Sequence, residues 1–380
     1  NKLIMDFYIQ KQDIVKALAL TSGVTEKKTI EVLSNVLIEV NESSLALTAS
    51  DLESWIITST RISNFVSGGK TTVDAKKLAD LCRLLPENSE IHISYDSNKL
   101  KIEAGTGTYL LATLPSDSFP VFEDFGESEQ INLKAQDLKG IIDKTSIGMA
   151  SSSFGRQQLE GLYFDINETT ITTIATDTSI AASASVQIEN LSKCQAIVSR
   201  KAVNQISKLI AGESENILIT ISPNAISIEA PSFRFSSKLI SGKYPYSVSQ
   251  VVDYSPGFEG SIIKIDPKTF SETINRISLI AMDGRAIKMI FASDGITLAG
   301  SNRSDKGNEL YKVEHTGPDM EILFDVGYFR QILSCIDEDI CELNIFGNDK
   351  ACTITTHGKY SNQYSVMPLL ETPATANLKK

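Results

Sequence analysis

Internal repetition is the feature that most constrains how this chain can fold. Segments 8–18 (YIQKQDIVKAL), 131–142 (INLKAQDLKGII) and 263–274 (IKIDPKTFSETI) share one pattern. Each has a short alternating run, then a polar turn, then apolar residues four apart, which lie on one face of a helix. A pattern written three times predicts three copies of one structural unit.

The strands that follow these helices repeat as well. In each copy an apolar strand, a polar turn and a second alternating strand follow the helix. Each second strand ends in a small residue, a hydroxyl residue and then Asp51, Asp177 or Asn302. Because three copies share this acid or amide, we predict that Asp177 caps a strand-end turn and is not a catalytic acid.

A second set of segments, 71–105, 196–231 and 321–356, repeats at spacings of 125 and 126 residues. Each reads as strand, helix and hairpin. The predicted fold class is therefore α+β, with three tandem similar domains, each made of two strand–helix–hairpin halves. Without regular crossover connections, we expect antiparallel sheets with helices segregated to one face.

Domain boundaries are expected where glycine, proline, serine and charge accumulate, at 125–130 and 254–261. The predicted domains are 1–126, 127–256 and 257–370. Residues 371–380 are expected to form a flexible tail.

Charge is unevenly distributed along the chain. The net charge of −11 argues against nucleic-acid binding only if it is evenly spread. The six repeat helices together carry +9, which leaves about −20 for the rest. If the helices share one surface, that surface would attract a phosphate backbone without reading its sequence. Ordinary solvated helix faces are the alternative.

No group of residues supports catalysis or a bound metal or cofactor. The three histidines are scattered, and the odd number of cysteines, five, without a CxxC pair, indicates reduced thiols. The run SGGKTT (67–72) lacks the full phosphate-loop pattern and reads as a turn before a strand. The acidic run 337–342 reads as a solvated turn in preference to a Mg²⁺ site. With no membrane-length apolar run and no signal-peptide pattern, a soluble cytoplasmic protein is expected.

Five segments carry a family resemblance: 114–120 (LPSDSFP), 173–181 (TIATDTSIA), 235–247 (FSSKLISGKYPYS), 316–329 (TGPDMEILFDVGYF) and 364–370 (YSVMPLL). In their order and spacing, over about residues 3–370, the chain resembles the β subunits of bacterial DNA polymerase III, the DNA sliding clamps.

The resemblance implies a head-to-tail homodimeric ring in the DNA clamp fold, with each chain forming half of the ring, helices inside and sheets outside. Such a ring encircles duplex DNA without sequence preference and tethers the replicative polymerase, which makes synthesis processive. It is not an enzyme, uses no cofactor, does not touch a membrane, and is expected in the cytoplasm at the nucleoid.

The resemblance and the helix charges together suggest DNA contacts. These are Lys28, Arg83, Arg156, Gln157, Arg200, Lys201 and Lys208. Apolar dimer contacts are implied on both sides of the interface, at Tyr109, Leu111, Leu279 and Ile280.

The resemblance also implies a hydrophobic pocket that takes short linear peptides from the DNA polymerase III alpha subunit, the clamp loader, and mismatch-repair and other clamp-motif proteins. The matching residues are Leu159, Thr176, Thr178, Ser179, Ile180, Ala181, Pro245, Ser365, Val366, Met367, Pro368 and Leu369, with Asp325 and Tyr328 at the rim. Thr178 to Ala181 replace the family's Gly-His-Arg-Leu, so this pocket is expected to be less polar.

A different class of function is also compatible with the repeats. An acidic, repeat-built scaffold for protein interactions would have the same three-domain organisation and would not bind DNA. Neutralising Arg200, Lys201 and Lys208 distinguishes the two, because only a clamp would then bind DNA more weakly.

Overall fold

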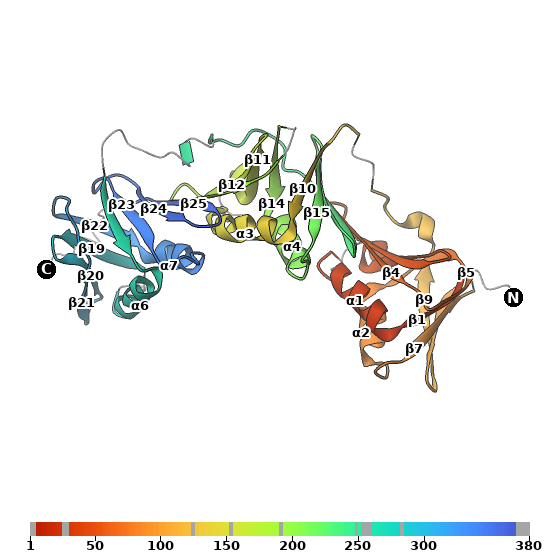
Figure 1. Cartoon of the computed structure of the whole chain (residues 1–380). Coiled ribbons are helices and arrows are strands. Elements are labelled where there is room, and N and C mark those ends of the chain that lie inside the picture. The colour runs from red at the N-terminus through yellow and green to blue at the C-terminus, as the bar shows by residue number, and fades with distance from the viewer. Residues whose placement is uncertain are drawn as a thin grey trace. The chain divides into compact units, whose positions relative to one another are not determined.

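The protein is described from a computed structural model, which covers residues 5–24, 30–96, 98–122, 126–151, 155–189, 193–247, 250–251, 260–281 and 285–369. Figure 1 shows the helices and strands, coloured along the chain. The chain divides into two compact units. The first unit comprises 1–135 and 204–239, and the second comprises 136–203 and 240–380.

The first unit contains one antiparallel sheet of thirteen described strands. Their order is β10 (Glu129–Lys134), β15 (Asn216–Ile221), β16 (Ala225–Ala230), β17 (Phe233–Lys238), β4 (Ser54–Arg61), β3 (Ser44–Ser50), β2 (Asn35–Val40), β6 (Gly69–Asp74), β9 (Gly107–Leu114), β8 (Lys99–Ala104), β7 (Glu90–Tyr95), β1 (Met5–Gln10) and β5 (Asn64–Ser67). The pairing of β17 with β4, with Ser236 opposite Trp55, joins two distant parts of the sequence into this sheet.

The second unit contains two antiparallel sheets among its described residues. The larger has the order β14 (Cys194–Ser199), β11 (Gly161–Ile166), β12 (Thr170–Thr176), β13 (Ile180–Gln187), β25 (Ser361–Val366), β24 (Cys352–His357), β23 (Cys341–Ile345) and β18 (Ser261–Ile265). The smaller has the order β21 (Lys306–Tyr311), β20 (Gly295–Ser301), β19 (Ala286–Ala292) and β22 (Met320–Asp325). Here β13 and β25 make the long-range pairing.

Six longer α-helices lie in the described residues at the predicted positions. They are α1 (Lys11–Thr21), α2 (Ala75–Leu84), α3 (Ala135–Thr145), α4 (Arg200–Ile210), α6 (Pro267–Ser278) and α7 (Val326–Ser334). Short 3₁₀ turns occur at η1 (Glu31–Ser34), η2 (Ser116–Ser118), η3 (Ser146–Gly148) and η4 (Gln157–Glu160).

The repeated polar residue between strand and helix has a clear role, because it caps the helix. Asp74 accepts a hydrogen bond from the N–H of Lys77 at 2.7 Å, and Asp266 and Asp325 cap α6 and α7 in the same way. A capping carboxylate satisfies backbone donors that have no partner inside the first turn. An aspartate therefore marks the change from strand to helix at α2, α6 and α7, whereas the side chain of Gln10 does not cap α1.

The hydrophobic cores follow the predicted alternation. In the first unit Phe7, Ile14 and Leu78 are fully buried, and they bring β1, α1 and α2 into one core. In the second unit Phe270 and Phe329, from α6 and α7, are buried together with Ile180 of β13. Each helix thus covers a sheet with its apolar face, as its four-residue spacing predicts.

The predicted α+β class with antiparallel sheets is confirmed, because neighbouring strands among the described residues pair in the antiparallel sense. The prediction of 67–72 as a turn before a strand is wrong for residues 69–72: Ser67 ends β5, only Gly68 lies between the strands, and 69–72 already belong to β6. All five cysteines are free. The predicted tail, 371–380, lies outside the described residues.

Neither a membrane span nor a metal site is present in the described part of the chain. No helix there is long and apolar enough to cross a membrane. No group of three or more His, Cys, Asp or Glu side chains there is arranged to hold a metal ion.

Candidate functional site

The turn between β12 and β13 is built by Asp177. Its Oδ1 accepts hydrogen bonds from the N–H groups of Ser179, at 2.8 Å, and Ile180, at 2.9 Å. The Thr176 hydroxyl donates to the Ile180 carbonyl at 2.7 Å and accepts from the N–H of Thr178. This is an Asx turn, in which the side chain takes the place of a backbone acceptor.

The same turn recurs in the other two copies. Asp51 accepts from the N–H groups of Glu53 and Ser54, at 3.0 and 2.6 Å. Asn302 accepts from those of Ser304 and Asp305, both at 2.8 Å. The prediction that this position caps a turn is therefore confirmed in all three copies.

A pocket of about 180 Å³ lies beside the Asp177 turn, within the second unit. It is lined by Thr176, Thr178, Ser179, Ile180, Ala181, Tyr246, Gln250, Val251, Ala351, Ser365 and Met367. None of these side chains carries a formal charge at neutral pH. A small uncharged concavity with a few hydroxyl and amide groups suits an apolar side chain that is positioned by hydrogen bonds.

The pocket wall is rigid because two paired strands form it. Ala181 of β13 lies opposite Ser365 of β25, and the N–H of Met367 donates to the Ser179 carbonyl at 2.8 Å. Ile180 and Val366 are buried in the core behind the wall. Met367 itself is 44% exposed, so its thioether side chain is available at the mouth.

Tyr328 connects α7 to this turn. Its hydroxyl donates to Asp177 Oδ2 at 3.2 Å, so the capping carboxylate also takes part in a tertiary contact. Burial, and after it the Asp177 charge, raise the pKa of Tyr328 above its ordinary value. Asp325, which caps α7, accepts from the Arg285 guanidinium at 2.7 Å. Both predicted rim residues thus hold α7 in place.

Several of the predicted pocket residues do not line the cavity. Leu159 and Val366 are buried behind it, Pro245 and Leu369 are exposed, and Pro368 is partly buried. Sequence reasoning missed four lining residues: Tyr246, Gln250, Val251 and Ala351. Tyr246 directly follows the predicted residue Pro245, and this position could have indicated it. No sequence pattern indicates Gln250, Val251 or Ala351.

Thr178 has a backbone conformation that β-branched residues avoid, with φ at +78°. We expect Thr178→Gly to raise the free energy of unfolding by about 1 kcal/mol, because glycine adopts positive φ without strain, although it loses more entropy on folding. Denaturant unfolding of the two proteins measures the change. Thr178→Ala, which keeps a Cβ, is the control, and a less stable glycine variant would contradict the strain.

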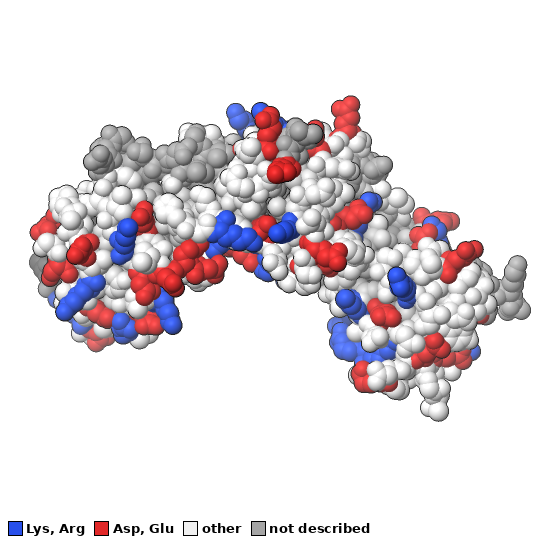
Figure 2. Space-filling view, in the orientation of Figure 1, with Lys and Arg blue, Asp and Glu red and all other residues white. Residues whose placement is uncertain are grey.

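The predicted DNA-contacting side chains are mostly exposed on the helices and nearby loops. Arg83 lies in the last turn of α2 and pairs with Asp80 at 3.2 Å, while Lys201 and Lys208 are exposed on α4. Arg156 and Gln157 are exposed at the start of η4, and Lys28 lies outside the described residues. Figure 2 shows lysine and arginine side chains gathered over α1 and α2, and a mixture of both signs over α6 and α7.

Arg200 has a structural role as well. Its guanidinium donates to the carbonyls of Met149 and Ala150, at 2.7 and 2.8 Å, although the residue is exposed. Neutralising Arg200 would leave these carbonyls without their donor, which makes it a poor residue for testing charge alone.

The predicted interface residues lie on or beside strands with an open edge. Residues 107–112 of β9 pair only with β8 among the described strands, and β21 ends the order of its sheet. Tyr109 is 39% exposed and Leu279 is 85% exposed, whereas Leu111 and Ile280 are partly buried. Apolar side chains beside an unpaired edge favour association with another strand.

Comparisons with known proteins identify relatives along the whole chain. Family models for the N-terminal, central and C-terminal domains of the DNA polymerase III beta subunit match residues 5–123, 132–246 and 256–370. The beta sliding clamps of Pseudomonas putida and Vibrio cholerae are 29% and 28% identical, over 96% of this chain and 100% of each relative. Two crystal structures, of the Pseudomonas aeruginosa DNA polymerase III beta subunit and the Caulobacter crescentus sliding clamp, match with TM-scores of 0.90 and 0.88. Their identities are 28% and 26%, and they cover 96% and 97% of this chain and 100% of each structure.

Proposed function

Because this chain belongs to the family of DNA polymerase III beta subunits, we propose that two copies close into a ring around duplex DNA. The chain is a DNA sliding clamp, and its family consists of processivity factors that have no catalytic activity of their own. The consecutive match of three family domains over residues 5–370 is the observation that carries this conclusion. The three tandem domains predicted from the repeats agree with it, and their boundaries at 126, 256 and 370 remain our proposal.

The DNA-facing surface is proposed to consist of the repeat helices, with Arg83, Lys201 and Lys208 among the contacts. Lysine and arginine side chains attract the phosphate backbone without reading bases, so the protein can move along the duplex. A closed ring retains DNA by topology, and its lining therefore needs only weak contacts. This explains how a chain of net charge −11 can function on DNA.

The ring requires a second copy of the chain. The open edges of β9 and β21 are the proposed contact strands, with Tyr109, Leu111, Leu279 and Ile280 as the apolar side chains between the copies. A head-to-tail contact of two different surfaces closes into a ring when the rotation allows it. The proposed place of action is the cytoplasm, at the nucleoid.

The uncharged pocket beside Asp177 is the proposed partner site. Its occupants would be short apolar peptides of the DNA polymerase III alpha subunit, the clamp loader, and mismatch-repair and other clamp-motif proteins. The uncharged wall formed by Thr178 to Ala181 favours apolar peptide side chains over acidic ones, because no cation among the described lining residues would compensate a buried carboxylate.

Retention on closed DNA tests the ring. Protein loaded onto circular DNA is expected to stay bound through gel filtration at high salt, and to be released when one cut makes that DNA linear. Salt weakens phosphate contacts but does not open a topological link. Equal loss from circular and linear DNA, or a solution mass of 41.5 kDa at micromolar concentration, would contradict the ring.

Charge neutralisation tests the lining. The triple variant Arg83→Gln, Lys201→Gln, Lys208→Gln is expected to bind DNA more weakly. The slope of its affinity against salt concentration, on logarithmic axes, should fall by about one unit for each side chain that no longer neutralises a phosphate. The matched control neutralises Lys70, Lys193 and Lys264, which are not part of the repeat helices and pair with exposed or partly exposed carboxylates.

Equal effects of the two triple variants would show that net charge alone governs binding. No effect of either would favour the acidic scaffold without DNA binding, the alternative that the family membership does not support.

A further inference from the structure

A second and larger cavity, of about 520 Å³, lies entirely within the first unit. Its floor is the outer face of β2, β3, β4 and β17, where Leu37, Thr48 and Ile57 follow one another across the sheet. The segment 116–122, which follows β9, forms the other wall. Nothing in the proposed ring or partner pocket uses this cavity.

The internal repeat relates this cavity to the partner pocket. Trp55 is the second residue of β4 and lies opposite Ser236 of β17; Ala181 is the second residue of β13 and lies opposite Ser365 of β25. All four line their respective cavities. Both pairs join strands of two consecutive repeats, and the Asx turns of Asp51 and Asp177 precede them.

The second wall is repeated too. The sequence Phe119-Pro120-Val121 recurs 125 residues later as Tyr244-Pro245-Tyr246. Phe119 and Tyr244 are both buried, 5% and 4% exposed, and so anchor their segments in the same manner. Val121 and Tyr246 then line the two cavities. Three equivalent positions thus contribute lining residues to both sites.

The chemistry of the larger cavity selects an uncharged, apolar occupant. The charged residues among the described lining, Glu39, Lys70, Asp117 and Arg234, sum to zero. Lys70 pairs with Glu39 at 2.7 Å, and Arg234 pairs with Glu229 at 2.6 Å. A charged ligand group would therefore gain little there.

Apolar surface is nevertheless open at this site. Val121 is 85% exposed and Ile57 is 36% exposed, while Trp55 and Phe122 pack edge to face at 5.0 Å. Exposed apolar groups around a concavity are typical of a binding site.

We propose that this cavity is a second docking site for a short apolar peptide, equivalent through the repeat to the pocket beside Asp177. The inference rests on the proposed function, because it assigns the same class of partner to a second position. An extended peptide presents alternate side chains to one wall, so its apolar residues would enter the cavity and its polar residues would face solvent. Each chain could then hold two peptide segments at once.

The position of Trp55 provides a direct test, because it is the only tryptophan of the chain. The probe is a dansyl-labelled pentapeptide, Leu-Ser-Leu-Ser-Leu, and selective excitation of tryptophan reports binding near Trp55 through dansyl emission. Dansyl anisotropy reports all binding to the protein. We expect saturable energy transfer that Met367→Asp, in the other pocket, leaves unchanged. Ile57→Asp and Val121→Asp should each weaken it at least tenfold.

Ile57 and Val121 are exposed, so aspartate at either position should not impair folding. Thermal unfolding of each variant verifies that it is folded. Energy transfer that persists in both Ile57→Asp and Val121→Asp would overturn the second site. The second site would also be overturned if Met367→Asp abolished the anisotropy change and Ile57→Asp and Val121→Asp did not affect it. In that case the peptide would bind only in the pocket beside Asp177. No anisotropy change at all would overturn both sites for this class of peptide. A peptide with asparagine in place of leucine is the matched control.

Discussion

In a chain carrying Met367→Asp, the pocket beside Asp177 is expected to bind apolar partner peptides at least about a hundredfold more weakly, with the unfolding curve unchanged. Met367 lines the 180 Å³ pocket, whose other lining side chains are uncharged. In the free protein position 367 is 44% exposed, so a carboxylate there stays hydrated and folding is not affected. A bound peptide would remove that water, and desolvating a carboxylate without a partner costs several kcal/mol. Each loss of about 1.4 kcal/mol corresponds to a tenfold loss of affinity.

The measurement is a titration of the labelled Leu-Ser-Leu-Ser-Leu peptide, followed by anisotropy in Ile57→Asp protein so that only the pocket beside Asp177 contributes. Met367→Leu is the matched control, because it keeps an apolar side chain of similar volume and should bind within a few-fold of the parent. Parental affinity in Met367→Asp would show that peptides do not contact this wall.

The turn at Asp177 was predictable from sequence because the three internal repeats can be compared with one another. Asp51, Asp177 and Asn302 occupy one position in three copies, so a role shared by all three had to be structural, and each caps its turn through the same pair of backbone donors. The starts of α2, α6 and α7 were predictable in a similar way, since an aspartate at or directly after the end of the preceding strand caps each of these helices.

The remaining lining residues depend on tertiary structure, and no sequence pattern marks them. Ala351 lies between β23 and β24, and it lines the pocket only because β13 pairs with β25 and so brings that hairpin beside Ala181. Arg200, in contrast, was predicted from its charge, but the prediction covered only part of its role. Its charge predicted a DNA contact, but the charge of a side chain says nothing of the two carbonyls to which it donates.

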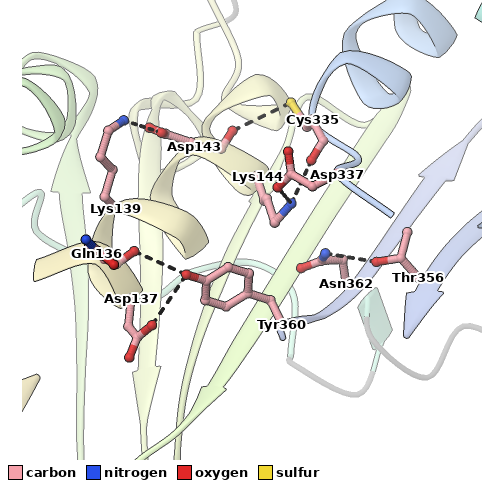
Figure 3. Close-up of polar contacts among 10 residues, drawn as sticks. All are labelled: Gln136, Asp137, Lys139, Asp143, Lys144, Cys335, Asp337, Thr356, Tyr360 and Asn362. Atoms are coloured by element: carbon pink, nitrogen blue, oxygen red, sulfur yellow. Dashed lines mark hydrogen bonds and ion pairs between the residues drawn. The ribbon is translucent and has the colours of Figure 1, made fainter. Parts of the chain in front are cut away.

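The packing of α3 against the β24–β25 hairpin depends on Gly140, which has no side chain. Figure 3 shows Tyr360 lying across α3, with its hydroxyl 3.2 Å from the Gln136 carbonyl and 3.4 Å from Asp137 Oδ1. A Cβ at Gly140 would lie 2.3 Å from the Tyr360 hydroxyl oxygen, closer than any non-bonded approach allows. Glycine is therefore required for the approach of the ring, even inside a helix where alanine is normally preferred.

Two lysine ion pairs lie close to the Tyr360 ring. Lys144 is buried and donates to the Cys335 carbonyl at 2.8 Å and to Asp337 at 2.9 Å, as Figure 3 shows. Lys359 pairs with Asp137 at 2.5 Å. The two ammonium groups lie 5.8 and 5.2 Å from the centre of the Tyr360 ring, a favourable arrangement of cation and aromatic face. Displacing the ring would disturb its hydrogen bonds to α3 and its contacts with the two ammonium groups.

Gly140→Ala is accordingly expected to destabilise the protein by about 2 kcal/mol. Overpacking and the disruption of the Tyr360 hydrogen bonds outweigh the gain of up to about 1 kcal/mol from alanine's higher helix propensity. Denaturant unfolding at equal protomer concentration measures it, with Gly212→Ala as the control, since a Cβ there would meet no atom within 4 Å.

The cause is separable by a double-mutant cycle. Tyr360→Leu removes the aromatic ring and its hydroxyl, so in that background Gly140→Ala should cost much less, and the two changes should be non-additive by at least about 1 kcal/mol. Additive effects would mean that Gly140 is needed for some reason other than the ring. Because Tyr360 begins the turn into β25, whose partner β13 carries the pocket wall, loosening this packing should also weaken peptide binding, whereas Gly212→Ala should not.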